Sequence, residues 1–203
     1  MEKNELSATG SRYFLTSLIG ANEEYVRNII PLFSIVMFLF LFSTYLGYVM
    51  GEGIPASAFE DILGNIPQPT GSNDLDILVA IISNNIIAAF IFLASGVVIG
   101  IPPLIFVELN GFFVGWISYT ASIEVGLGTV AISLLPHGVI EIPTVILCAA
   151  MGMGLGYQLV NRIRGREGLQ RYVIDSLRVF TTRVIPFLVV AGLIETGVIT
   201  ILT

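Results

Sequence analysis

Residues 29–50 read IIPLFSIVMFLFLFSTYLGYVM, an apolar run without a single charged side chain. At about 1.5 Å per residue, a helix of this length crosses a bilayer core of roughly 30 Å. The run is longer than the apolar region of a signal peptide and lacks a clean small-residue cleavage site. Tyr45 and Tyr48 near its end fit an aromatic belt at a membrane interface. We therefore interpret this run as a retained transmembrane helix.

The composition of the whole chain agrees with this interpretation. Of the 203 residues, 55% are hydrophobic and only 12% are charged, whereas soluble domains carry about 25% charged residues. The sequence predicts an all-α, polytopic helix bundle in the cell membrane, folded as one domain over residues 1–203. The lipid bilayer is its expected partner. Because the formal net charge is −6, we expect no nucleic acid partner.

The distribution of basic residues predicts the topology. Three of the nine lie before the first apolar run, and the other six lie between residues 161 and 183. The segment 51–74 contains acidic residues but no Lys or Arg. Basic residues mark cytoplasmic loops. This pattern places the N-terminal segment 1–28 and the connector 161–183 inside, and the loop 51–74 outside.

Five crossings follow from the apolar runs, with the N-terminus inside and the C-terminus outside. Pro102 and Pro103 are expected to form the inner turn between the second and third spans, because residues before proline leave the helical region. Residues 122–160 must then make one net crossing. We expect a short re-entrant piece, a break at Pro136–Gly138 and a full span to about residue 160. The predicted spans are 29–50, 75–99, 104–121, the segment ending near 160, and 184–203.

Residues 134–143, LLPHGVIEIP, are the most unusual stretch inside the membrane region. They contain the single histidine of the chain, His137, and Glu141 four residues later, which lies on the same helix face. Pro143 would remove one backbone N–H and crowd the carbonyl of Val139. Polar, interrupted segments at membrane depth persist where they line a cavity or are buried in protein. This stretch is therefore the first candidate for function.

Several motifs resemble the stage II sporulation protein M family of membrane proteins. The resemblance covers most of the chain from about residue 27, and the Pro-His-Gly-x-x-Glu element at 136–141 is its most specific part. The family's best-described member belongs to a bacterial spore-engulfment complex that works with cell-wall hydrolases. The resemblance implies an all-helical membrane protein, and it does not by itself transfer the engulfment role. The motifs are Asn84-Asn85, Gly96…Gly100, Asn110-Gly111…Gly115, Leu135–Pro143 and Ala191–Glu195.

The polar residues predicted inside the membrane leave three functions open. They form a candidate intramembrane site of His137, Glu141, Glu195, Asn84 and Asn85, with Glu108 and Asn110 as secondary members. If the protein is transporter- or channel-like, which is the first function, these residues line a polar site. In the second, a non-catalytic scaffold that assembles with other envelope proteins, they only fix helix packing. In the third, a metal-dependent enzyme, they bind zinc.

Each alternative has a consequence for the site. A metal site normally needs three or four protein ligands, and His137, Glu141 and Glu195 would have to supply them without a second histidine. We expect no enzyme activity and no cofactor. We expect Glu108 to lie near the inner interface, where it reaches the headgroups or pairs with an arginine of the connector.

Glycine spacing makes a separate prediction about packing. Four pairs are spaced four residues apart, which allows two helices to approach closely in lipid. We expect these pairs to serve contacts within the chain rather than a dedicated dimer interface, although a homo-oligomer stays open. The pairs are Gly47/Gly51, Gly96/Gly100, Gly111/Gly115 and Gly152/Gly156.

Overall fold

The computed structural model describes residues 23–54 and 74–202, except for the side chains of 74, 133–137 and 198–202. Every regular element in these residues is helical, so the all-α prediction is confirmed for the described part of the chain. The predictions for residues 1–22 and 55–73 lie outside it. The elements are α2 (Glu23–Met50), the 3₁₀ turn η1 (Gly51–Gly53), α4 (Asp74–Ser95), α5 (Ile101–Val125), α6 (Leu127–Ile163), α7 (Leu169–Val179), the π-helical turn η2 (Phe180–Val184) and α8 (Ile185–Leu202).

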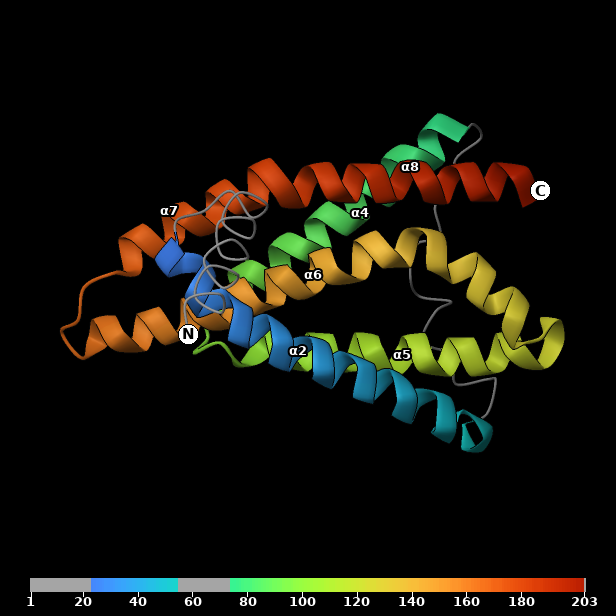
Figure 1. Ribbon diagram of the computed structural model, residues 1–203, viewed down its shortest axis with the longest axis horizontal. Coiled ribbons are helices and arrows are strands. Elements are labelled where there is room, and N and C mark those ends of the chain that lie inside the picture. Colours follow the sequence, from blue (N-terminus) through green and yellow to red (C-terminus); the bar gives the residue numbers. More distant parts are fainter. Residues whose placement is uncertain (1–22, 55–73, 203) are drawn as a thin grey trace, which may run out of the picture.

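Five helical segments are long and apolar enough to cross a membrane, which is the number that the sequence predicts. Figure 1 shows them side by side along the long axis of the molecule, with α6 running between α4 and α8 on one side and α2 and α5 on the other. Helix α2 begins at the end where α6 stops, and α8 stops at the opposite end. The segments are Glu23–Gly53, Leu75–Ser95, Ile101–Val125, Gly138–Ile163 and Leu169–Gly197.

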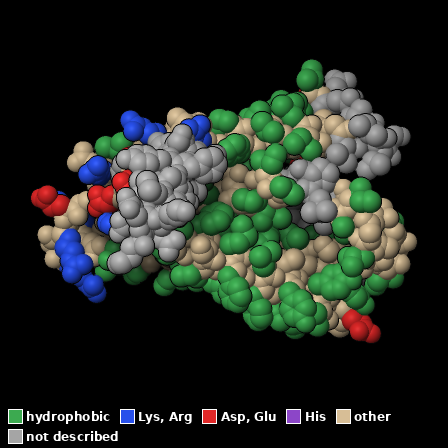
Figure 2. Space-filling model, in the orientation of Figure 1, with side chains coloured by type: hydrophobic (Ala, Val, Ile, Leu, Met, Phe, Trp, Pro, Cys, Tyr) green, Lys and Arg blue, Asp and Glu red, His purple; other side chains and the backbone are tan. Residues whose placement is uncertain are grey.

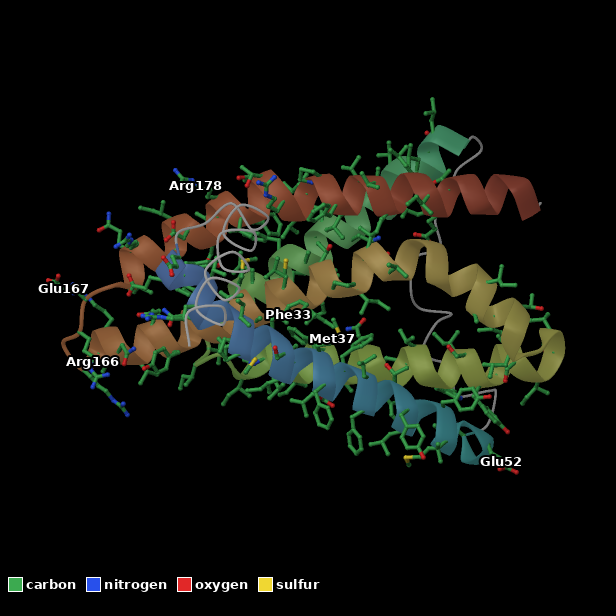
Figure 3. All side chains as sticks on the ribbon, viewed as in Figure 1. Phe33, Met37, Glu52, Arg166, Glu167 and Arg178 are labelled. Carbon is green, nitrogen blue, oxygen red and sulfur yellow. The ribbon has the colours of Figure 1, made fainter. Side chains whose placement is uncertain are left out.

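Charged side chains lie at the two ends of this bundle. On the face shown in Figure 2, hydrophobic side chains cover the middle, and Lys and Arg side chains gather at the end that contains α7. Figure 3 places Arg166 and Arg178 at that end and Glu52 at the other, with Phe33 and Met37 of α2 between them. The charge pattern of the sequence therefore corresponds to two distinct ends of the fold.

Helix α6 differs from the interrupted segment that the sequence suggests. The backbone stays helical through Pro136, Gly138 and Pro143, so the prediction that the helix is broken there is wrong. The 37-residue helix is about 55 Å long by the usual rise. Figure 1 shows that it bends where its colour passes from yellow to orange. The hydroxyl of Thr144 donates to the carbonyl of Ile140 at 2.6 Å, next to the turn that Pro143 disturbs. Such side-chain bonds and neighbouring helices let a membrane helix tolerate proline.

The turn between α4 and α5 comes earlier than predicted. Helix α4 ends at Ser95, residues 96–100 form the turn, and α5 begins at Ile101, so Pro102 and Pro103 lie inside its first helical turn. Proline suits this position because its fixed φ is helical and its missing N–H has no partner there anyway. The prolines start the helix instead of forming the turn.

The connector and the last span form one continuous helical path. After the loop 164–168, α7 leads through η2 directly into α8. The π-helical turn ends two residues before Pro186, which cannot donate to the carbonyl of Thr182 and crowds it. A wider turn relieves that crowding. The sequence predicts a connector separate from the last span, and in the structure the two are continuous.

Glycines bring α2 and α5 into backbone contact, as predicted. A Cβ at Gly47 would overlap the carbonyl of Phe112, and a Cβ at Gly115 would overlap the carbonyl of Thr44. Residues 40–51 thus lie against 111–119 in a parallel arrangement. This interface is closely packed over three helical turns.

A second glycine contact joins the α4–α5 turn to α6. A Cβ at Gly96 would overlap the carbonyl of Gly152, and a Cβ at Gly156 would overlap the backbone nitrogen of Gly100. Gly100 also has φ +75, which favours glycine. All four predicted glycine pairs therefore serve contacts within the chain.

Candidate functional site

A groove lies at membrane depth between α4, α5 and α6. Its volume is about 460 Å³. Four of its lining side chains are polar, namely Asn84 and Asn85 of α4, Asn110 of α5 and Glu141 of α6. The structure thus brings together four residues that the sequence singles out. The other lining residues are Phe40, Ala88, Ile91, Phe92, Phe106, Val107, Val114, Ile142, Val145 and Ile146.

The contact between α4 and α6 explains why Asn85 faces Glu141. Gly96 and Gly152 meet toward the end of the bundle that contains α7, and each polar residue precedes the glycine of its own helix by 11 positions. At 1.5 Å per residue, both side chains therefore lie roughly 16 Å further along the bundle. The amide of Asn85 and the carboxyl of Glu141 both line the groove and are close enough to interact. The register of α4 against α6 therefore brings Asn85 and Glu141 to the same level of the bundle.

The other two asparagines lie on the open side of the groove. Asn84 and Asn110 are both exposed in the isolated chain. The side-chain nitrogen of Asn110 donates to the carbonyl of Phe106 at 2.7 Å, so its side-chain oxygen stays able to accept from a ligand. Asn84 is rotated by about 100° from Asn85 around the helix, which is why the adjacent pair has different surroundings. Their exposure means that polar amides face either water or lipid.

Glu195 approaches the same region from α8. Gly192 of α8 packs against Ile82 of α4, which puts Glu195 roughly 9 Å further than Asn85 toward the end of the bundle where α8 stops, by the helical rise. The carboxyl of Glu195 lies close enough to that of Glu141 for the two to interact electrostatically. Helices α4, α6 and α8 therefore meet around these side chains. The imidazole of His137, which the sequence pairs with Glu195, lies outside the described side chains.

Glu108 lies where α5 packs against α2. It faces α2, where the hydroxyl of Ser43 donates to the carbonyl of Glu108 at 2.6 Å. The carboxyl oxygen Oε1 of Glu108 is buried and has no hydrogen-bond partner among the described residues. The expectation that Glu108 lies near the inner interface, where it reaches the headgroups or an arginine of the connector, stays a prediction.

A metal centre has no support in the described part of the chain. There, no group of three or more His, Cys, Asp and Glu side chains lies close enough to hold a metal ion. The ligand set of His137, Glu141 and Glu195 stays a prediction, since the histidine side chain is not described.

With this geometry established, the family can be identified. The family described as stage II sporulation protein M matches residues 36–200 of this chain. The chain belongs to that family. The matched residues of this stage II sporulation protein M family member include the four polar groove residues and Glu195.

A curated relative gives a further comparison. An uncharacterised protein of Methanocaldococcus jannaschii is 28% identical to this stage II sporulation protein M family member over 181 residues. The alignment covers 87% of this chain and 77% of that protein. No match was found among solved structures.

Sequence reasoning missed the aromatic wall of the groove. Phe92 follows Asn85 by seven positions, and Phe106 precedes Asn110 by four. Both spacings put the aromatic ring on the same helix face as the asparagine. The signal was therefore present, but only the contact of α4 and α5 with α6 shows that the two faces line one space.

Proposed function

We propose that this protein is a five-crossing protein of the cell membrane whose groove is a transport-type site for a small positively charged solute. The observation that carries the proposal is the placement of Asn85 and Glu141, from two different helices, in one groove at membrane depth, close enough to interact. Ionisable residues at this depth are costly, and by default they mark pathways for ions or substrates. The proposal involves no cofactor and no catalysed reaction.

The end of the bundle that contains α7 faces the cytoplasm in this proposal. Arg166 and Arg178 lie there in Figure 3, and Glu52 lies at the opposite end. Cytoplasmic loops are rich in Lys and Arg. With five crossings, α2 then begins inside and α8 ends outside. In this orientation, the helices that line the groove run from one side of the membrane to the other.

The polar side chains are staggered along the bundle, which supports a path rather than an isolated pair. Pro103 packs against Gly152, so Asn110 lies roughly 10 Å from that level by the helical rise. Asn85 and Glu141 lie at roughly 16 Å, and Glu195 at roughly 25 Å. This series covers about half of a hydrocarbon core of roughly 30 Å.

The chemistry of the lining favours a cation. Among the described lining residues there is no Lys or Arg. A carboxylate can only accept hydrogen bonds, and amide oxygens also accept. A positively charged solute would find acceptors from three helices, whereas an anion would meet a glutamate.

The proposal is tested by cation and proton flux into liposomes that contain the purified protein. We expect flux above that of empty liposomes, and its loss in Glu141→Gln, which keeps the shape of the side chain. Glu52→Gln is the matched control, because Glu52 is exposed at the far end of α2, and it should behave as wild type. Wild-type protein that adds no flux would overturn the proposal. If a membrane or envelope protein then co-purifies with the chain, the scaffold function takes its place.

A further inference from the structure

The groove has an aromatic side as well as a polar one. The rings of Phe92 and Phe106 lie with their centroids 5.8 Å apart, and Phe40 also lines the space. These rings lie between α4, α5 and α2, while the acidic group comes from α6. An occupant would thus meet aromatic faces and a carboxylate at once.

The volume of the groove distinguishes two kinds of cation. At about 30 Å³ per water molecule, the 460 Å³ of the groove correspond to about 15 waters. A bare inorganic cation instead needs a compact shell of six to eight oxygens at about 2.0–2.6 Å. Pockets for small organic molecules have about 300–1,000 Å³ and are mostly apolar with a few polar groups. The groove matches the second description.

The groove is also open toward the surroundings of the bundle. Ile91, which lines it, is 48% exposed, and Asn84 and Asn110 at its rim are exposed as well. A solute with an apolar body can therefore enter between α4 and α5. An opening of this kind suits a molecule that partitions into the membrane interface.

We propose that the groove binds a small organic cation, such as a substituted ammonium ion, with its charged group at Glu141 and Asn85 and its apolar body against Phe92 and Phe106. This inference rests on the proposed function and names its substrate class. The faces of aromatic rings attract organic cations, and the carboxylate supplies the opposite charge. Inorganic cations lack the apolar body that the aromatic side would bind.

The experiment measures uptake of radiolabelled tetraethylammonium and of rubidium by the same liposomes. Tetraethylammonium is permanently charged and does not cross as a neutral base. We expect uptake of tetraethylammonium by wild type, its loss in Glu141→Gln, and an affinity lowered about three- to tenfold in Phe92→Leu and Phe106→Leu, the range of a cation–π contact. Phe38→Leu is the matched control, because Phe38 is 66% exposed on α2, and it should leave uptake unchanged.

A second measurement needs only wild type and so does not depend on how the variants fold. Tetramethylammonium and tetraethylammonium are compared as competitors, and the larger ion is expected to compete better because it covers more of the aromatic side. Equal competition by the two ions would overturn the aromatic contact. Uptake of rubidium alone, sensitive to Glu141→Gln, would overturn this inference and leave the proposed function standing. Uptake of neither ion would overturn both.

Discussion

Helix α5 meets two neighbours in opposite ways. Against α2 it packs over three helical turns through Gly111 and Gly115, with backbone atoms in contact. Against α4 it is close at the connecting turn, and further out the two helices leave a groove of about 460 Å³ over α6. At the first interface one carboxyl oxygen of Glu108 is buried, and at the second Asn84 and Asn110 are exposed. Close packing and an open polar space thus share one helix, which suggests that the α2–α5 pair is the rigid wall of the site.

The largest expected effect is on the closely packed interface. In Gly115→Leu, the new side chain would overlap the backbone of Thr44, which cannot move aside as a flexible side chain can. Overpacking of this kind destabilises by about 1–3 kcal/mol or more. We expect a clearly lower thermal unfolding temperature in detergent. Gly128→Leu is the control, because no atom lies within 4 Å of a Cβ at Gly128. Equal stability of the two variants would contradict the close α2–α5 packing.

The next prediction concerns Asn85 and Glu141, and it distinguishes a role in stability from a role in cation uptake. Replacing Asn85 by Leu removes the partner of Glu141, and an interhelical bond of this type contributes about 0.6–1.7 kcal/mol. The double variant Asn85→Leu/Glu141→Leu leaves no polar group unpaired, so we expect it to be at least as stable as Asn85→Leu. Its cation uptake should nevertheless be lost.

A double-mutant cycle with unfolding and uptake measured on each variant checks this expectation. Loss of stability that is recovered in the double variant, together with uptake that is not recovered, supports a functional pair. Full uptake in the double variant would show that Asn85 and Glu141 only hold α4 and α6 together.

The comparison also shows what the sequence could and could not predict. Apolar length predicts the five helices, and the spacing of four predicts that these glycines serve contacts within the chain, because both depend on the geometry of one helix at a time. Asn85 and Glu141 were found because polar side chains at membrane depth are rare. These features are local, and a local pattern is sufficient for them.

Features that depend on distant helices were missed. The contact of Ser43 with Glu108 requires knowing that α2 lies parallel to α5 rather than to its neighbour in sequence, α4. The backbone is helical through Pro136, where a rule for proline taken alone predicts a break. The turn prediction at Pro102 and Pro103 failed because proline also suits the first turn of a helix, and the break prediction failed because the helix continues through Pro136 and Pro143.

A smaller effect on stability is expected at Ser43, which contacts the backbone of Glu108. Ser43→Ala removes the hydrogen bond to the carbonyl of Glu108, and a typical bond of this kind contributes about 0.5–1.5 kcal/mol. We expect a slightly lower unfolding temperature and unchanged cation uptake, since neither residue lines the groove. Ser118→Ala is a fair control, because its hydroxyl bonds only within α5, to the carbonyl of Val114. If Ser43→Ala lowered uptake as much as Glu141→Gln, Glu108 would belong to the cation path.

The smallest effect on stability is expected on the open side of the groove. The side chain of Asn110 is exposed and bonds only to the carbonyl of its own helix, at Phe106, so Asn110→Leu should change the free energy of unfolding by no more than about 0.5 kcal/mol. Uptake should fall, because one acceptor at the rim is replaced by an apolar group. Ser34 is a matched position on α2, exposed and bonded to the carbonyl of Ile30 in the same way. Ser34→Leu should leave both stability and uptake unchanged. Equal uptake by the two variants would mean that the rim of the groove faces lipid and takes no part in binding, and it would confine the site to Asn85 and Glu141.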